Sequence, residues 1–214
     1  GQEDIDETPT TALNASGTEF IGSFPVSAHT PPDHVDGDAK VVVIGTDAEG
    51  NTTPDGTLPT RGAFLHIDTR TPTFTLTYWT DSSLRHRMPK NPTNVPVSKA
   101  GEAWFNIASN ERLSSPPTVN VDQVGTTDGS GTATQTDTEG LYFKYGYTVH
   151  EDDGSNYEDG LAYLTLDATD IAGNTTTGES PLQGSKFEID TTPPQPPTIV
   201  LPATSTTFTQ LGGI

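Results

Sequence analysis

The sequence predicts an all-β protein made of antiparallel sheets, and three observations lead to this prediction. Threonine supplies 37 of the 214 residues, and β-branched residues favour strands over helices. The 21 glycines and 18 prolines are scattered along the chain, where they favour turns. Between them lie apolar or alternating runs of strand length, at residues 41–44, 74–79 and 161–166. These runs indicate a folded chain, although only 30% of the residues are hydrophobic.

The net charge of the chain indicates which classes of partner it can bind. There are 29 acidic and 10 basic residues, which give a net charge of −19. Such a surface repels nucleic acid and anionic membranes, so we expect no nucleic-acid partner. No apolar stretch approaches the ~20 residues of a membrane span, so we expect no direct membrane insertion. The absence of cysteine excludes a disulfide framework, and the excess of carboxylates favours cations as partners.

An internal repeat organises the chain. Residues 39–68 and 162–190 align when Asp47 is placed on Asp170. Both copies then contain a D-x-x-G-N motif followed by two threonines, and both end in Ile-Asp-Thr. Each copy predicts the same hairpin, with strands at 40–46 and 62–67 in the first copy and at 162–169 and 185–189 in the second.

Further strands are predicted upstream of each hairpin. An alternating strand lies at 18–28 in the first copy and at 141–149 in the second. The second copy has more, at 73–79, 96–107 and 118–124. A total of about seven strands is typical of a sandwich of two antiparallel sheets. We therefore expect three parts: 1–73, the C-terminal part of a sandwich; 74–191, a complete sandwich; and 192–214, a Pro-rich linker with opening strands at 198–201 and 206–209.

The second copy resembles the Ig-like domains that occur in tandem in very large bacterial and archaeal surface adhesins and fibres. The resemblance lies in VSKAGEAWFNIASNE (97–111), LYFKYGYTV (141–149), EDGLAYLTLDATDIAGN (158–174) and FEIDTTPPQPP (187–197). The first copy resembles only the C-terminal half of such a domain. The resemblance implies tandem Ig-like β-sandwiches, of which the N-terminal one is incomplete within the chain, at an extracellular position on the cell surface.

The resemblance also implies calcium near the domain junctions. Calcium takes six to eight oxygen ligands from carboxylates, carbonyl groups and water. Carried over by position, the ligands would be Asp47, Asn51 and Asp68 in the first copy and Asp170, Asn174 and Asp190 in the second. The alternative is a turn in which Asp and Asn cap their own backbone without a metal.

The expected function is that of a structural repeat unit of an adhesin, stalk or self-assembling filament, stiffened by calcium. Its partners would be neighbouring Ig-like repeats or copies of itself. The incomplete first copy leaves two explanations open: a window of a longer repeat protein, or a subunit polymerised by donor-strand complementation through residues 192–214.

The alternative function is a glycan- or protein-binding Ig-like module of a secreted protein or hydrolase, with a host or cell-surface glycan or protein as its partner. Clustered surface aromatics would favour it, but Trp79 and Trp104 lie inside predicted strands and are expected in the core.

No catalytic motif is present. The histidines at 29, 34, 66, 86 and 150 never occur at the spacing of a zinc site. The sequence also lacks a G-x-S-x-G elbow, a phosphate-binding loop and a dinucleotide fingerprint. We therefore expect no enzymatic activity.

Overall fold

The computed structural model describes residues 12–13, 20–21, 25–30, 35–54 and 57–198, and the elements assigned in them are all strands. None of these residues belongs to a helix that is long and apolar enough to cross a membrane. The prediction of an all-β fold is confirmed. Apart from Thr198, the strands expected at 198–201 and 206–209 lie outside the described residues.

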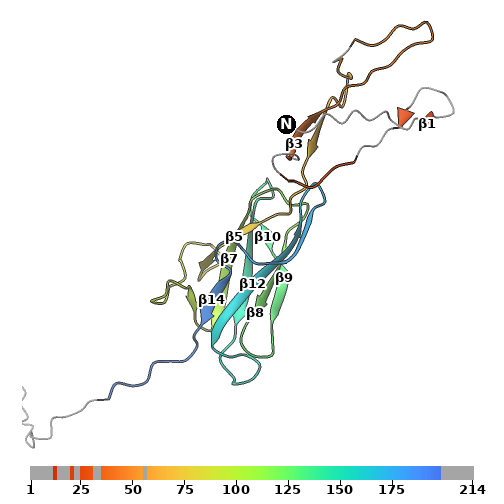
Figure 1. Cartoon of the computed structure of the whole chain (residues 1–214). Coiled ribbons are helices and arrows are strands. Elements are labelled where there is room, and N and C mark those ends of the chain that lie inside the picture. Colours follow the sequence, from red (N-terminus) through yellow and green to blue (C-terminus); the bar gives the residue numbers. More distant parts are fainter. Residues whose placement is uncertain (1–11, 14–19, 22–24, 31–34, 55–56, 199–214) are drawn as a thin grey trace, which may run out of the picture.

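Two sheets between residues 74 and 189 pack as a β-sandwich (Figure 1). The first sheet has the order β10 (Thr134–Gln135), β11 (Tyr142–Val149), β7 (Gly101–Ser109) and β5 (Phe74–Trp79). The second has the order β6 (Val97–Ser98), β14 (Lys186–Ile189), β12 (Gly160–Thr169), β8 (Thr118–Asp122) and β9 (Gly129–Thr132). β13 (Thr175–Glu179) also pairs with β12. All pairings are antiparallel except that of β6 with β14.

One hydrophobic core lies between the two sheets. The strands alternate between buried and more exposed residues, because successive side chains of a strand point to opposite faces. Phe105 and Phe187 come from opposite sheets, and their ring centroids lie 5.5 Å apart. Tyr78 packs against both rings and donates a hydrogen bond to the carbonyl of Gly184. The core therefore joins residues that are more than 100 positions apart.

The two tryptophans do not lie in this core, so that expectation is wrong. Trp79 and Trp104 are directly opposite each other in β5 and β7, and both are only partly buried. Their neighbours Tyr78 and Phe105 take the inward positions, and the alternation of a strand then turns the tryptophans outward. The guanidinium of Arg87 lies 4.1 Å from the Trp79 ring centroid.

The first copy contributes two small pairs of strands. β1 (Ala12–Leu13) pairs with β2 (Phe20–Ile21), and β3 (Gly37–Lys40) pairs with β4 (Phe64–Ile67). The strand expected at 40–46 is mostly absent, because β3 ends at Lys40. In the second copy the corresponding stretch of β12 is held by β8. No counterpart of β8 flanks β3 in the part of the chain that the structure describes.

The repeat found in the sequence is present in three dimensions. Gly37 faces Ile67 in β3–β4, as Gly160 faces Ile189 in β12–β14. The aspartate before each glycine accepts a hydrogen bond from the threonine that follows the terminal aspartate. These Oγ1–Oδ1 distances are 2.8 Å for Thr69 to Asp36 and 2.7 Å for Thr191 to Asp159. Both hairpins therefore end in the same clamp.

Burial differs sharply between the two hairpins. Phe187 and Leu166 are fully buried, whereas the corresponding residues Leu65 and Val43 are 40% and 57% exposed. In the second copy the sheet of β5, β7 and β11 covers this face. Within the described residues no such sheet covers the face of the first hairpin. Its apolar face, which comprises Val43 and Leu65, is therefore left exposed.

The matched pair Phe187 and Leu65 tests this difference. We expect Phe187→Ala to lower the free energy of unfolding of the sandwich by about 3–5 kcal/mol, because it leaves a cavity in the core. Leu65→Ala is expected to change it by about 0.5 kcal/mol or less, as at exposed positions. Urea denaturation followed by tryptophan fluorescence measures both changes. Equal losses in the two variants would contradict the assignment of the core.

Candidate metal centre

The D-x-x-G-N turn of the second copy fixes a carboxylate at the end of β12. Asp170 follows directly after Thr169, the last residue of β12, and is 1% exposed. Its Oδ1 accepts hydrogen bonds from the backbone N–H groups of Gly173 (2.7 Å) and Asn174 (2.9 Å). Its Oδ2 accepts one from the Asn174 side-chain amide at 2.8 Å. Gly173 has a φ of +99°, a conformation that favours glycine.

The first copy contains the same turn in a more exposed place. Asp47 Oδ1 accepts from the backbone N–H of Asn51 at 2.7 Å, and Oδ2 accepts from its side-chain amide at 2.8 Å. These hydrogen bonds, first among them those from Asn51, hold the pKa of Asp47 below its ordinary value. Each Asp and Asn pair therefore caps its own turn, as one of the two sequence-based alternatives describes.

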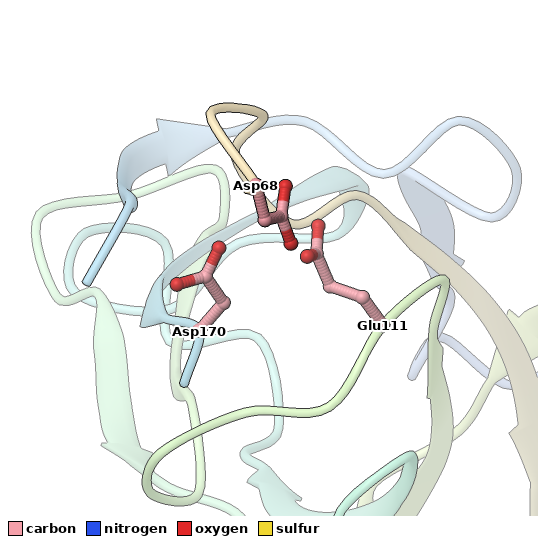
Figure 2. A group of neighbouring side chains, drawn as sticks. All are labelled: Asp68, Glu111 and Asp170. Carbon is pink, nitrogen blue, oxygen red and sulfur yellow. The ribbon is translucent and has the colours of Figure 1, made fainter. Parts of the chain in front are cut away.

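Three carboxylates meet beside the turn of the second copy (Figure 2). Asp68 comes from the segment after β4, Glu111 from the loop after β7 and Asp170 from the end of β12. One carboxylate oxygen of each lies within 4.8 Å of the others. The side chain of Asn174 also donates a hydrogen bond to the backbone carbonyl of Asp68 at 3.1 Å. The cluster thus lies where the end of the first copy meets the second copy.

The cluster concentrates negative charge. Burial raises the pKa of Glu111 to about 7, and a hydrogen bond to the Asp68 carboxyl and the charges of Asp68 and Asp170 act in the same direction. The ion pairs found within the described residues involve Asp36, Asp38 and Asp81. None of them neutralises the three clustered carboxylates. Close carboxylates of this kind repel one another.

The side chains of the cluster fit a hard divalent cation. Calcium and magnesium prefer oxygen ligands, and three carboxylates from separate segments supply them. The cluster contains no histidine and the chain no cysteine, so the softer ligands typical of zinc are missing. Asp68, Glu111 and Asp170 would hold the ion directly, and carbonyl oxygens or water would complete its shell.

The sequence predicted one set of calcium ligands in each copy of the repeat, and the structure groups these residues differently. It brings together Asp68, Asp170 and Asn174, although Asp68 belongs to the first copy. Asp47 and Asn51 contact each other in their own turn. Asp190 lies at the opposite end of β12 from Asp170, because Ile189 pairs with Gly160. There its carboxylate accepts a hydrogen bond from the backbone N–H of Thr192.

Glu111 was missed by the sequence reasoning. It lies two residues after β7, at the end of the segment VSKAGEAWFNIASNE. Because the first copy has no matching segment, comparison of the repeats could not select it. The signal that remains in the sequence is its position shortly after the alternating apolar residues Ala103, Phe105 and Ile107.

Comparisons with known protein families, with curated proteins and with solved structures found no match to this chain. The functional argument therefore depends on the residues and geometry of the molecule itself.

The raised pKa of Glu111 predicts how stability depends on pH when no divalent cation is present. Because the folded pKa (about 7) exceeds the ordinary value of 4.5, the folded state binds this proton more tightly than the unfolded state. Its contribution to stability is complete below pH 4.5 and is lost as the pH rises through about 7. We therefore expect the Tm in chelator to fall across this window, and to fall less in Glu111→Gln. Identical slopes in the two proteins would contradict the electrostatic account of the cluster.

Proposed function

We propose that this chain is an extracellular structural unit of tandem Ig-like repeats, part of a cell-surface adhesin, stalk or self-assembling filament, in which calcium stiffens the junction between repeats. The observation that supports the proposal is the origin of the clustered carboxylates. Asp68 ends the first copy, whereas Glu111 and Asp170 belong to the second. A cation bound by all three would tie the two copies together. The role is mechanical and not enzymatic.

The proposed mechanism is electrostatic. Without a cation, the charges of Asp68, Glu111 and Asp170 repel one another, and the repulsion opposes close contact between the copies. A divalent cation neutralises the repulsion and attracts all three carboxylates. The turn around Asp170 is held by its own hydrogen bonds, so its carboxylate does not have to be ordered on binding. The angle between the copies then depends on the calcium concentration.

The uncovered face of the first hairpin supports the second part of the proposal, donor-strand complementation. Val43 and Leu65 are exposed, although the corresponding residues of the second copy are fully buried. Apolar faces of this kind are covered when a neighbouring chain adds strands. The covering strands would come from a preceding repeat or from a second copy of the chain, with residues 192–214 as the candidate donor segment.

Calcium is expected to raise the Tm of the chelator-treated protein by several degrees. At a free calcium concentration of about 100 times the Kd, the stabilisation is ~2.7 kcal/mol. Asp68→Asn and Glu111→Gln should lose most of this shift. Asp190→Asn is the matched control, because Asp190 occupies the equivalent place at the end of the other hairpin, and it should retain the shift. A wild-type protein whose Tm is the same in calcium and in chelator would refute the calcium part of the proposal.

Donor-strand complementation predicts that the chain forms polymers when it is expressed alone. Light scattering after size exclusion should detect them, and removal of residues 199–214 should leave monomers. Leu65→Glu should also reduce polymer formation, because it places a charge on the uncovered face. Leu182→Glu is the control, since Leu182 is 70% exposed and lies outside that face. If the 214-residue chain remains monomeric at high concentration, self-completion is ruled out.

A further inference from the structure

An open groove follows β11 on the side that faces β9 and β10. It has a volume of ≈ 360 Å³, and its lining includes Trp104, Lys144 and Gly146. A second hollow of ≈ 290 Å³ shares four residues of β11 with it, Tyr145, Gly146, Tyr147 and Thr148, and extends to His150. From Lys144 to His150 the strand rises roughly 20 Å, at ~3.4 Å per residue. The two hollows therefore form one elongated groove.

The groove exists because the chain changes sheets beside β11. β9 pairs with β8 in one sheet, and β10 then pairs with β11 in the other sheet only at Phe143 and Lys144. The backbone N–H of Thr136 donates to the carbonyl of Tyr142, so the even-numbered residues of β11 direct their backbone groups to this side. Gly146 and Thr148 consequently present backbone donors and acceptors to the groove.

The Trp104 ring lies against Gly146 at one end of the groove. A Cβ atom at Gly146 would lie 2.8 Å from the Trp104 ring, and one at Gly131 would lie 2.9 Å from the Tyr145 ring. Gly129 has the same relation to Tyr147. Tyr147 is 8% exposed and Tyr145 packs against the core, so their rings lie beneath β9 and only their backbone borders the groove. None of these glycines has a positive φ, so the backbone conformation would allow other residues. Glycine is needed here because any side chain would collide with the neighbouring ring. The Trp104 indole also donates a hydrogen bond to Glu102 Oε2 at 3.0 Å.

Polar side chains complete the lining. Thr132 and Thr134 come from the β9–β10 segment, and Thr148 comes from β11 itself. Lys144 Nζ lies 5.7 Å from the Trp104 ring centroid. At the far end the rings of His150 and Tyr157 stack with centroids 4.2 Å apart. Aromatic surfaces therefore lie at the two ends, Trp104 at one and His150 with Tyr157 at the other, and hydroxyl, carboxylate and backbone amide groups lie between them. Ligand sites combine such surfaces with a few polar groups that fix the ligand's orientation.

We propose that this groove binds a neutral oligosaccharide of several hexose units. Sugar rings offer C–H faces to aromatic side chains and hydroxyl groups to polar ones, and the length of the groove suits a chain of sugars. The net charge of −19 disfavours anionic ligands. A peptide strand is less well matched, because strand addition requires a continuous backbone ladder and β10 already occupies this edge of β11 at Phe143 and Lys144. The groove does not include Asp68, Glu111 or Asp170, so this proposal is independent of calcium.

The test is an NMR titration of the ¹⁵N-labelled full chain with cellotetraose, chitotetraose and mannotetraose. At least one tetrasaccharide should shift the indole N–H signal of Trp104 and the amide signals of Gly146 and Thr148. The amide signal of Tyr163 should stay in place, because Tyr163 lies on β12 of the other sheet and does not line the groove.

Substitutions then locate the site. Trp104→Ala should weaken binding by roughly tenfold or more, a loss that the titration resolves easily. Thr134→Arg should do the same from an exposed position, which provides a second test if Trp104→Ala does not fold. Tyr163→Ala is the control, since Tyr163 is 48% exposed on the other sheet, and it should bind as the unmodified chain does.

Three outcomes would overturn the proposal. The first is the absence of shifts with all three tetrasaccharides at millimolar concentration. The second is unchanged affinity in Thr134→Arg and in a folded Trp104→Ala variant. The third is that no sugar shifts any signal, whereas an extended Thr- and Val-rich peptide shifts the amide signals of Gly146 and Thr148. The edge of β11 would then be a strand-addition site.

Discussion

The contact between the two copies is built around one buried carboxylate, that of Asp170. Three hydrogen bonds from Gly173 and Asn174 fix it at the end of β12, and it is almost inaccessible to solvent. Asp68 approaches this fixed group, and its backbone carbonyl accepts a hydrogen bond from Asn174. The first copy is therefore joined to the second at a point where like charges meet. A polar contact and an electrostatic repulsion oppose each other at the same junction.

The repeated clamp places the terminal aspartates in equivalent positions. Asp36 binds Thr69 and Asp159 binds Thr191, so the chain leaves both hairpins in the same way. Asp68 and Asp190 each precede the clamped threonine. Only Asp68 has a D-x-x-G-N turn beside it within the described residues. A tandem array would repeat this relation at every junction, which is why the proposed calcium site belongs to the repeat as a whole and not to one domain.

The sequence predicted the features that depend on local chemistry. The turns at Asp47 and Asp170 follow from the D-x-x-G-N motif, because the side chain caps nearby backbone groups. The main strands follow from alternation of apolar residues. The polar strands β9, β10 and β13 were missed, since their sequences, GSGT, TQ and TTTGE, carry no apolar period and pair only because a neighbour is present. The strand expected at 40–46 is mostly absent because it has no neighbour to pair with. The corresponding part of β12 pairs with β8, whereas no such strand lies beside β3 in the described part of the chain.

Long-range geometry was not predictable from one sequence. The meeting of Asp68 with Glu111 and Asp170 joins segments that are 43 to 102 residues apart in the numbering. The outward direction of Trp104 depends on which residues of β7 face the core, and Phe105 and Ile107 decide this by packing. That reversal bears on the proposed oligosaccharide site. It moves a large aromatic ring from the expected core to the wall of a groove.

The central claim is that one cation joins the two copies through Asp68, Glu111 and Asp170. Anomalous diffraction from crystals grown with calcium tests it most directly. The account predicts an anomalous peak with carboxylate oxygens of all three residues at ~2.3–2.6 Å, the range of calcium–oxygen distances. Well-diffracting crystals with excess calcium and no peak among these carboxylates would contradict it, as would an ion bound by the Asp170 turn without Asp68.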